Sequence, residues 1–241
     1  MAKTVFERTE KKYLLTPEQY EQMLAGLQGH MRIDSYGLTT ICSVYYDDHC
    51  DRLIRNSIQR PVYKEKLRVR AYGIPERDST VYVELKKKFK GVVYKRRAGM
   101  KLHEAESFLA GGEPPGERTQ IINEIAWVRD FYDLSPHVYI AYDRIALECP
   151  ENPRLRVTFD SNVRARSHDL SLALGDHGQP LLPEGYRLME IKAPGAVPMW
   201  LCDLLSELKI YPSRFSKYGT YYQQLIEENL NQPKEKENCH V

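Results

Sequence analysis

The sequence lacks most of the signatures that identify common enzyme classes. Its five cysteines are scattered and contain no CxxC pair, which argues against both a zinc ribbon and a disulfide framework. It also has no GxxxxGK[ST] loop, no HExxH motif and no GxSxG motif. These absences argue against a P-loop nucleotidase, a zinc peptidase of the HExxH type and an α/β-hydrolase.

Long hydrophobic runs and a large excess of one charge are missing as well. No apolar stretch approaches the roughly 20 residues that cross a bilayer, and residues 1–13 contain no signal-peptide core. We therefore expect a soluble, cytoplasmic protein. Lys and Arg number 35 against 33 Asp and Glu, for a net charge of +2. An anion site must then come from local grouping, and the near-neutral charge argues against a nucleic-acid partner.

The chain reads as one strand-rich unit over residues 1–230, followed by a polar tail over 231–241. Alternating patterns predict strands at 4–13, 39–47, 62–72, 80–89, 91–98, 137–147, 154–161 and 186–192. Helical patterns cover 17–27, 51–58, 101–110, 117–132, 197–209 and 214–229, with Thr16 as a cap and Pro17 in the first turn of the first helix. Strands with helices between them indicate an α+β fold.

The strands place cations on one face. In the strand over 62–72, Lys66, Arg68 and Arg70 share a face, and Leu67 and Val69 lie on the other. The same phase holds Glu84, Lys86, Lys88, Lys95, Arg97, Tyr142, Arg144, Arg156, Asp160, Glu190 and Lys192 on the other strands. A solvated face normally mixes both signs, because like charges opposite each other on neighbouring strands repel. So many cations in one phase therefore call for an anion.

Closing this sheet would place the charged face inside and the apolar face against the helices. We expect an eight-stranded antiparallel β-barrel whose interior is a wet, cationic tunnel. Arginine forks and lysines bind phosphate oxygens. The few inward carboxylates would be repelled by phosphate unless they held a hard cation such as Mg²⁺ or Mn²⁺.

Nine fragments, in this order, resemble a known family. They are ERTEKKY, VYYDD, KLRVRAYG, VELKKK, KRR, YDRIALE, LRVTFD, MEIK and SRFSKYG, which span about residues 5–228. Their order and spacing resemble the VTC (vacuolar transporter chaperone) polyphosphate polymerase domain, in the triphosphate tunnel metalloenzyme (CYTH-like) superfamily.

The resemblance implies an eight-stranded tunnel that transfers the γ-phosphate of ATP onto a polyphosphate chain. It implies phosphate contacts from Lys12, Arg68, Arg70, Lys86, Lys95, Arg144 and Arg156, a tunnel-lining hydroxyl at Tyr142, and Lys217 near the tunnel mouth. Glu190 would be the principal ligand of Mn²⁺ or Mg²⁺. Lys66, Lys88, Arg97 and Lys192 share the inward phase and are expected to bind substrate.

One departure from the superfamily concerns its opening strand. Hydrolases and cyclases usually open with ExExK, whereas the in-phase residues here are Arg8, Glu10 and Lys12. Glu10 therefore stays as the second metal-ligand candidate. Replacement of one carboxylate by a cation resembles the polymerase branch and weakens the case for a two-metal hydrolase.

We expect the site to catalyse phosphoryl transfer mainly by aligning the reacting phosphates and neutralising their charge. The attacking phosphate oxygen is already ionised, so the site needs alignment and charge neutralisation more than a strong base. We assign the aligning role to Arg68, Arg70, Lys86, Arg144 and Arg156. The alternatives are a triphosphatase on the same scaffold and a non-catalytic module that binds polyphosphate or inositol phosphates. A membrane-protein partner and the oligomeric state are left open by the sequence.

Overall fold

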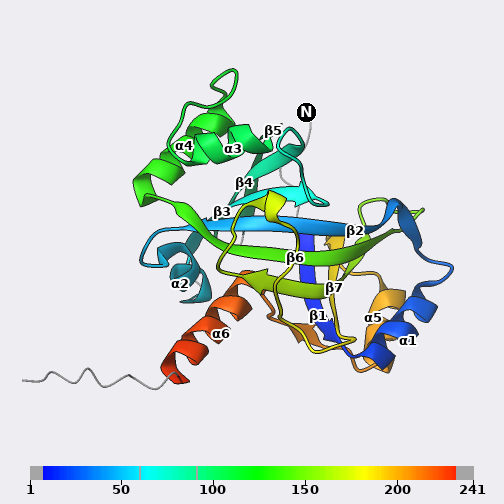
Figure 1. The fold of residues 1–241 in the computed structure, drawn as a ribbon. Helices are drawn as coiled ribbons and strands as arrows, with labels where there is room; N and C mark the ends of the chain where they lie inside the picture. Colours follow the sequence, from blue (N-terminus) through cyan, green and yellow to red (C-terminus); the bar gives the residue numbers. More distant parts are fainter. Residues whose placement is uncertain (1–7, 60, 91, 232–241) are drawn as a thin grey trace, which may run out of the picture.

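One antiparallel sheet runs through the computed structural model, which describes residues 8–59, 61–90 and 92–231 (Figure 1). The strands are β1 (Arg8–Leu15), β2 (Arg32–Asp47), β3 (Tyr63–Tyr72), β4 (Thr80–Phe89), β5 (Val92–Lys101), β6 (Ser135–Glu148), β7 (Arg156–Arg166), β8 (Gln179–Pro180), β9 (Arg187–Pro194) and β10 (Pro212–Ser213). They pair in the order β10-β1-β9-β7-β6-β2-β3-β4-β5, and β8 pairs with β7. All eight predicted strands are present.

All six predicted helices are present too. They are α1 (Pro17–Leu27), α2 (Arg52–Gln59), α3 (Leu102–Leu109), α4 (Gln120–Tyr132), α5 (Met199–Glu207) and α6 (Lys217–Asn231). A 3₁₀ turn, η1 (Leu172–Leu174), lies between β7 and β8. The start of α1 follows the predicted chemistry. The Thr16 hydroxyl accepts from the Gln19 N–H at 3.2 Å, and the Gln19 side chain accepts from the Thr16 N–H at 3.2 Å.

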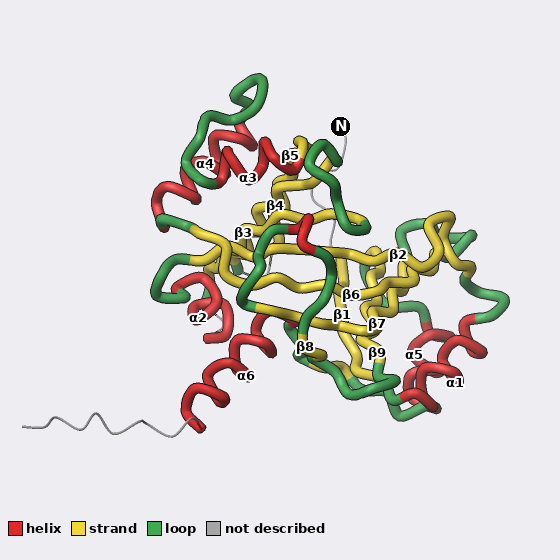
Figure 2. Tube along the Cα trace, viewed as in Figure 1, coloured by secondary structure: helices red, strands yellow, loops and turns green. Residues whose placement is uncertain are grey.

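Apolar side chains of the strands pack against these helices in separate clusters. Leu67, Val83 and Leu85 are wholly buried in a cluster that also contains residues of α3 and α4. Met189 and Ile191 of β9 lie in a second cluster with residues of α1 and α5. Figure 2 shows these helix pairs at opposite ends of the sheet. Beneath these helices the outer face is therefore hydrophobic, as the strand phase predicts. A third cluster departs from that prediction, because Ile41, Val138 and Ile140 share the face of Arg68 and Arg70 and pack with residues of α2 and α6.

The sheet curls strongly towards its other face. Lys12 on β1 and Lys86 on β4 are six strands apart in the pairing order, which in a flat sheet is roughly 29 Å at about 4.8 Å per strand. Burial is the main cause that lowers the pKa of Lys12, and repulsion from Lys86 adds to it. Such repulsion acts only between ammonium groups that lie much closer than a flat sheet allows, so the ends of the sheet approach each other.

The predicted barrel is confirmed only as a curled antiparallel sheet. In the described part of the chain, the pairing order ends at β5 on one side and β10 on the other. Among the residues that the structure describes, no strand pairing joins β5 to β10. An edge strand rich in cations, such as β5 with Lys95, Arg96 and Arg97, is protected against pairing with the edge of another sheet.

The short strands β8 and β10 and the turn η1 were not predicted, and one predicted strand is longer than expected. Strand β2 begins at Arg32, not at residue 39, and its first segment reaches β6 through a register shift between Ile33 and Leu38. Gly37 has a φ of 57°, a left-handed value that favours glycine. This break removes the alternation that marks a strand. The predicted tail, 231–241, lies outside the described residues except for Asn231, which ends α6.

Candidate functional site on the charged face

The predicted phase is confirmed by the strand register. Lys66 pairs with Lys86 and Lys86 with Lys95, so three neighbouring strands present cations side by side. At the other end, Lys12 pairs with Glu190 and Glu190 with Thr158. We call this inner surface the charged face. Its members include Lys12, Lys66, Arg68, Arg70, Glu84, Lys86, Lys95, Arg97, Arg144, Arg156, Asp160, Glu190 and Lys192.

The first corner of the charged face is built around Glu84 on β4. Arg68 donates two N–H groups to its Oε2 atom, at 2.8 and 2.7 Å. Arg97 and Lys95 both reach the Oε1 atom at 2.7 Å. Burial alone would raise the pKa of Glu84, but the cations, led by Arg68, hold it well below its usual range. Both oxygens are therefore already occupied by protein cations.

The second corner is built around Asp160 on β7. Arg144 grips it with two parallel bonds, Nε to Oδ1 at 2.6 Å and Nη2 to Oδ2 at 2.8 Å. Lys217, the first residue of α6, reaches Oδ2 at 2.5 Å and lies 4.1 Å from the centre of the Tyr142 ring. The SRFSKYG segment thus lies over the charged face, and Lys12 donates to its Phe215 carbonyl at 3.3 Å.

The third corner, around Glu190 on β9, is the least neutralised. Its Oε2 atom contacts Lys192 at 2.9 Å. Burial would raise the pKa of Glu190, but Lys192 and Lys12 outweigh it, so the carboxylate stays ionised. Two buried polar atoms beside it, Thr158 Oγ1 and Arg156 Nε, find no hydrogen-bond partner among the described residues.

The two unpartnered atoms indicate whether a metal cation and a phosphate fit beside Glu190. Thr158 is the register partner of Glu190, so a hydroxyl and a carboxylate face the same space. Oxygen donors of this kind suit Mg²⁺ or Mn²⁺. Buried polar groups are normally satisfied, and a bound phosphate would satisfy the unpaired N–H of Arg156. The residues present therefore fit a hard cation with a phosphate.

Sequence comparison shows which family the chain belongs to. The model of the VTC domain matches residues 7–226. This chain belongs to the VTC domain family. Vacuolar transporter chaperone complex subunit 4 of Trypanosoma brucei brucei (strain 927/4 GUTat10.1) is 23% identical over 269 residues, covering 89% of this chain and 34% of that protein. The chain thus spans about a third of the length of that relative.

Solved structures agree on the fold. A putative adenylate cyclase from Bacillus halodurans superposes with a TM-score of 0.52 at 13% identity, over 86% of this chain and 92% of that one. A putative adenylyl cyclase from Hippeastrum, whose title reports a dominant triphosphatase activity, gives 0.53 at 15% identity, over 90% and 96%. At these identities the likeness concerns the fold alone, which is CYTH-like.

Sequence reasoning missed the contribution of β2 to the charged face of this VTC domain. Tyr45 and Ser43 are register partners of Arg68 and Arg70. Arg68 donates to the Tyr45 hydroxyl at 2.9 Å, and Arg70 donates to Ser43 and to Tyr142 at 3.3 and 3.2 Å. Strand β2 carries no Lys or Arg between residues 33 and 47, so the charge pattern gave no signal there.

Two groups in this region titrate near neutrality. Burial would raise the pKa of Tyr45, but Arg68, Arg70 and Lys66 overcome it and lower the pKa to about 7. Burial also lowers the pKa of Lys66 to about 8, with Tyr45 opposing and neighbouring lysines assisting. The Tyr45 shift reports cations held close together, whereas the Lys66 shift reports mainly the burial of its ammonium group.

Some predicted residues lie at the margin. Lys88 is exposed and pairs with Lys64 at the end of the β3–β4 hairpin. Glu10, the second predicted metal ligand, is exposed, pairs with Lys192 and is diagonal to Glu190. Arg156 pairs with Asp34 of β2 at 2.9 Å, a partner that the sequence pattern did not indicate. Their roles in binding stay predictions.

Proposed function

We propose that this VTC domain is a metal-dependent polyphosphate polymerase that transfers the γ-phosphate of ATP onto a polyphosphate chain. The observation that carries the proposal is the convergence of cations from β1, β3, β4, β5, β6 and β9, with Lys217 of α6, on one curled surface. The protein's own carboxylates neutralise only part of this charge. A chain of phosphates supplies the missing negative charge at a regular spacing.

Arg70 illustrates how a phosphate would be gripped. Its guanidinium is buried, and its hydrogen bonds go to hydroxyls of Ser43 and Tyr142. Glu84 also attracts it, but that carboxylate is already shared with Arg68, Arg97 and Lys95, so the buried Arg70 charge would gain from a bound anion. Lys86 and Lys95 flank the same surface and would neutralise further phosphates, while Arg144 and Arg156 lie towards the Glu190 corner.

The chemistry asks these residues for alignment. The terminal phosphate of the acceptor is ionised, so its oxygen can attack without a strong general base. Arginines and lysines would hold donor and acceptor in line and stabilise charge on the transferring group. Glu190 and Thr158 would hold Mn²⁺ or Mg²⁺, which when bound supplies additional charge neutralisation at the phosphate oxygens.

A product assay tests the proposal. Purified protein with ATP and Mn²⁺ is expected to form long-chain polyphosphate, seen as a ladder on a urea gel. Free orthophosphate without polymer would replace the polymerase with a triphosphatase. Tight binding of polyphosphate or an inositol phosphate, without metal-dependent turnover of either kind, would replace it with a binding module.

We also propose that the domain acts in the cytoplasm beside a membrane-protein partner. The support is the name of the Trypanosoma relative, a subunit of a complex, of which this chain covers 34%. Across the described residues, none of the helices has the length and apolar character needed to cross a bilayer. Fractionation of source cells tests both points. Recovery of the protein outside the cytoplasm would contradict the first point. Absence of the protein from the membrane fraction would contradict the second.

A further inference from the structure

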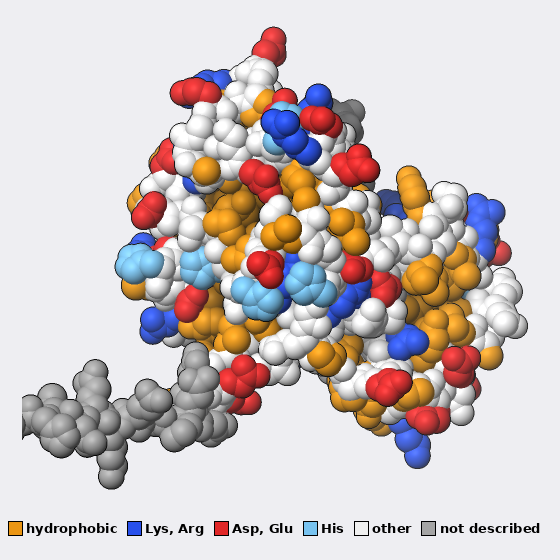
Figure 3. All heavy atoms as spheres, in the orientation of Figure 1, with side chains coloured by type: hydrophobic (Ala, Val, Ile, Leu, Met, Phe, Trp, Pro, Cys, Tyr) orange, Lys and Arg blue, Asp and Glu red, His pale blue; other side chains and the backbone are white. Residues whose placement is uncertain are grey.

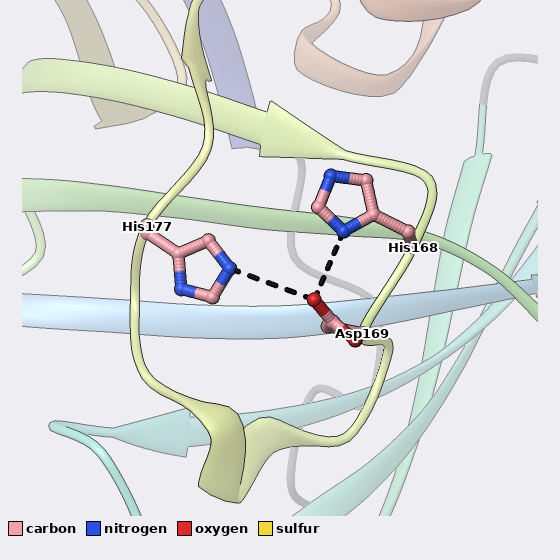
Figure 4. Close-up of side chains that lie close together, drawn as sticks. All are labelled: His168, Asp169 and His177. Carbon is pink, nitrogen blue, oxygen red and sulfur yellow. Dashed lines mark hydrogen bonds and ion pairs between the residues drawn. The ribbon is translucent and has the colours of Figure 1, made fainter.

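A second group of potential metal ligands lies away from the charged face, in the loop between β7 and β8. His168 Nδ1 is 3.0 Å from Asp169 Oδ2, and His177 Nε2 is 4.0 Å from the same oxygen. One ligand atom from each residue lies within 4.8 Å of the others. Figure 4 shows the two imidazoles on either side of the carboxylate, and Figure 3 shows histidines gathered on this surface.

The backbone that carries these side chains is held by a buried cation. Arg166, 2% exposed, donates to the carbonyls of Asp169 at 3.0 Å, Gly175 at 3.1 Å and His177 at 2.5 Å. Its guanidinium lies 3.6 Å from the centre of the Tyr139 ring. One side chain thus fixes the two loop segments on which the three ligands stand.

Further contacts hold the same loop in place. Arg164 donates to the Asp176 carbonyl and carboxylate, both at 2.5 Å. Leu172 is buried in the core at the tip of the loop. A Cβ on Gly178 would lie 2.7 Å from the Ala165 carbonyl oxygen, so only glycine allows the chain after His177 to approach β7 this closely. The backbone of the loop is therefore held in place, whereas the side chains of its three potential ligands are exposed.

We propose that His168, Asp169 and His177 form a binding site for a divalent transition metal, with Zn²⁺ as the best fit. Two imidazoles and one carboxylate are ordinary zinc ligands. In a tetrahedral site with bonds of about 2.0–2.1 Å, ligand atoms lie roughly 3.3 Å apart. The observed separations bracket that value, so rotation of exposed side chains completes the site. Three protein ligands leave a fourth position for water.

The nitrogen donors separate this site from the charged face. Imidazole favours Zn²⁺, whereas the Glu190 corner offers oxygen donors suited to Mg²⁺ or Mn²⁺. The two sites are therefore expected to take different metals. The surface site stands independently of the proposed polymerase activity.

Zn²⁺ titration by calorimetry, on the full chain with excess Mg²⁺ present, tests the proposal. Wild type is expected to bind one Zn²⁺ that His168→Ala, His177→Ala and Asp169→Asn each weaken at least about tenfold. His49→Ala, an exposed histidine in another loop, is the matched control and keeps wild-type affinity. Glu190→Gln also keeps it, which separates this site from the charged face.

A spectroscopic readout supports the ligand assignment. Co²⁺ in place of Zn²⁺ should give visible bands typical of nitrogen and oxygen ligands, and these bands should be lost in His168→Ala. Bands typical of thiolate ligands would overturn the proposal, since they would assign the metal to a cysteine. So would Zn²⁺ affinity that is unchanged in both histidine variants. In that case the carboxylate simply hydrogen-bonds its neighbouring imidazoles.

Discussion

The Glu84 and Glu190 corners of the charged face differ in how completely their carboxylates are neutralised. Glu84 has both oxygens engaged by Arg68, Arg97 and Lys95. Glu190 contacts Lys192 through one oxygen and lies beside the orphaned hydroxyl of Thr158. Both carboxylates come from the same strand pattern, in VELKKK and MEIK.

The difference separates a structural carboxylate from a ligand. A carboxylate surrounded by guanidinium groups holds those cations in place, and a metal there would have to displace them. A carboxylate with a spare oxygen and an unsatisfied neighbour can accept a cation without dismantling the site. The comparison thus predicts that substitution of Glu190 lowers metal-dependent turnover, whereas substitution of Glu84 lowers the stability of the fold.

The largest effect is expected for Glu190→Gln. Loss of the charged ligand should reduce metal-dependent turnover by about 10²–10³-fold, because the amide oxygen binds Mn²⁺ or Mg²⁺ weakly. The melting temperature should fall less than for Glu84→Gln, since Glu190 contacts one cation, Lys192, whereas Glu84 is engaged by three. Steady-state kinetics across Mn²⁺ concentrations, paired with thermal melts, measure both. Turnover retained at wild-type level would assign the metal elsewhere.

Glu84→Gln should act on stability instead. Removing this charge leaves Arg68, Arg97 and Lys95 uncompensated, at a cost of about 3 kcal/mol in the free energy of unfolding. The depressed pKa gives the same sign: the contribution of Glu84 is complete above its unfolded pKa of about 4.3 and is lost as the pH falls. Urea unfolding measures it.

A rescue experiment sharpens this second prediction. Tripolyphosphate should stabilise Glu84→Gln more than wild type, because the anion replaces the missing counter-charge. Glu124→Gln is the matched control, since Glu124 pairs with Lys87 and Arg96 on the opposite face of β4 and β5. Equal stabilisation of both variants would mean that Glu84 does not face the anion.

The smallest effect concerns pH. Tyr45, with a pKa of about 7, and Lys66, with a pKa of about 8, both lose protons as the pH rises. Each loss makes the charged face less positive, so tripolyphosphate affinity should fall several-fold over roughly pH 6 to 9. Tyr45→Phe should remove the part of the fall centred near 7. An identical pH profile in this variant would contradict the assignment.

The sequence allowed the charged face to be predicted because a strand alternates with a strict period of two. Lys66, Arg68 and Arg70 could be separated from Leu67 and Val69 by counting alone, and the register confirmed it. Tyr45 and Ser43 could not be found this way, because hydroxyls on an uncharged strand look like any half-buried strand. Their role appears only once β2 pairs with β3.

By itself the sequence determined the six helices, the eight longer strands, the faces of those strands and the sign of the charge on the inner face, because these follow from local periodicity. Tertiary structure alone decided which cation meets which carboxylate, because pairing depends on register and curl across strands far apart in the chain. Arg144 and Asp160 are 16 residues apart and Lys217 joins them from 57 residues further along. The histidine pair in the β7–β8 loop also depends on tertiary contacts. The buried Arg166 binds the carbonyls of Asp169 and His177 and so holds the two ends of the loop together, which strand periodicity does not predict.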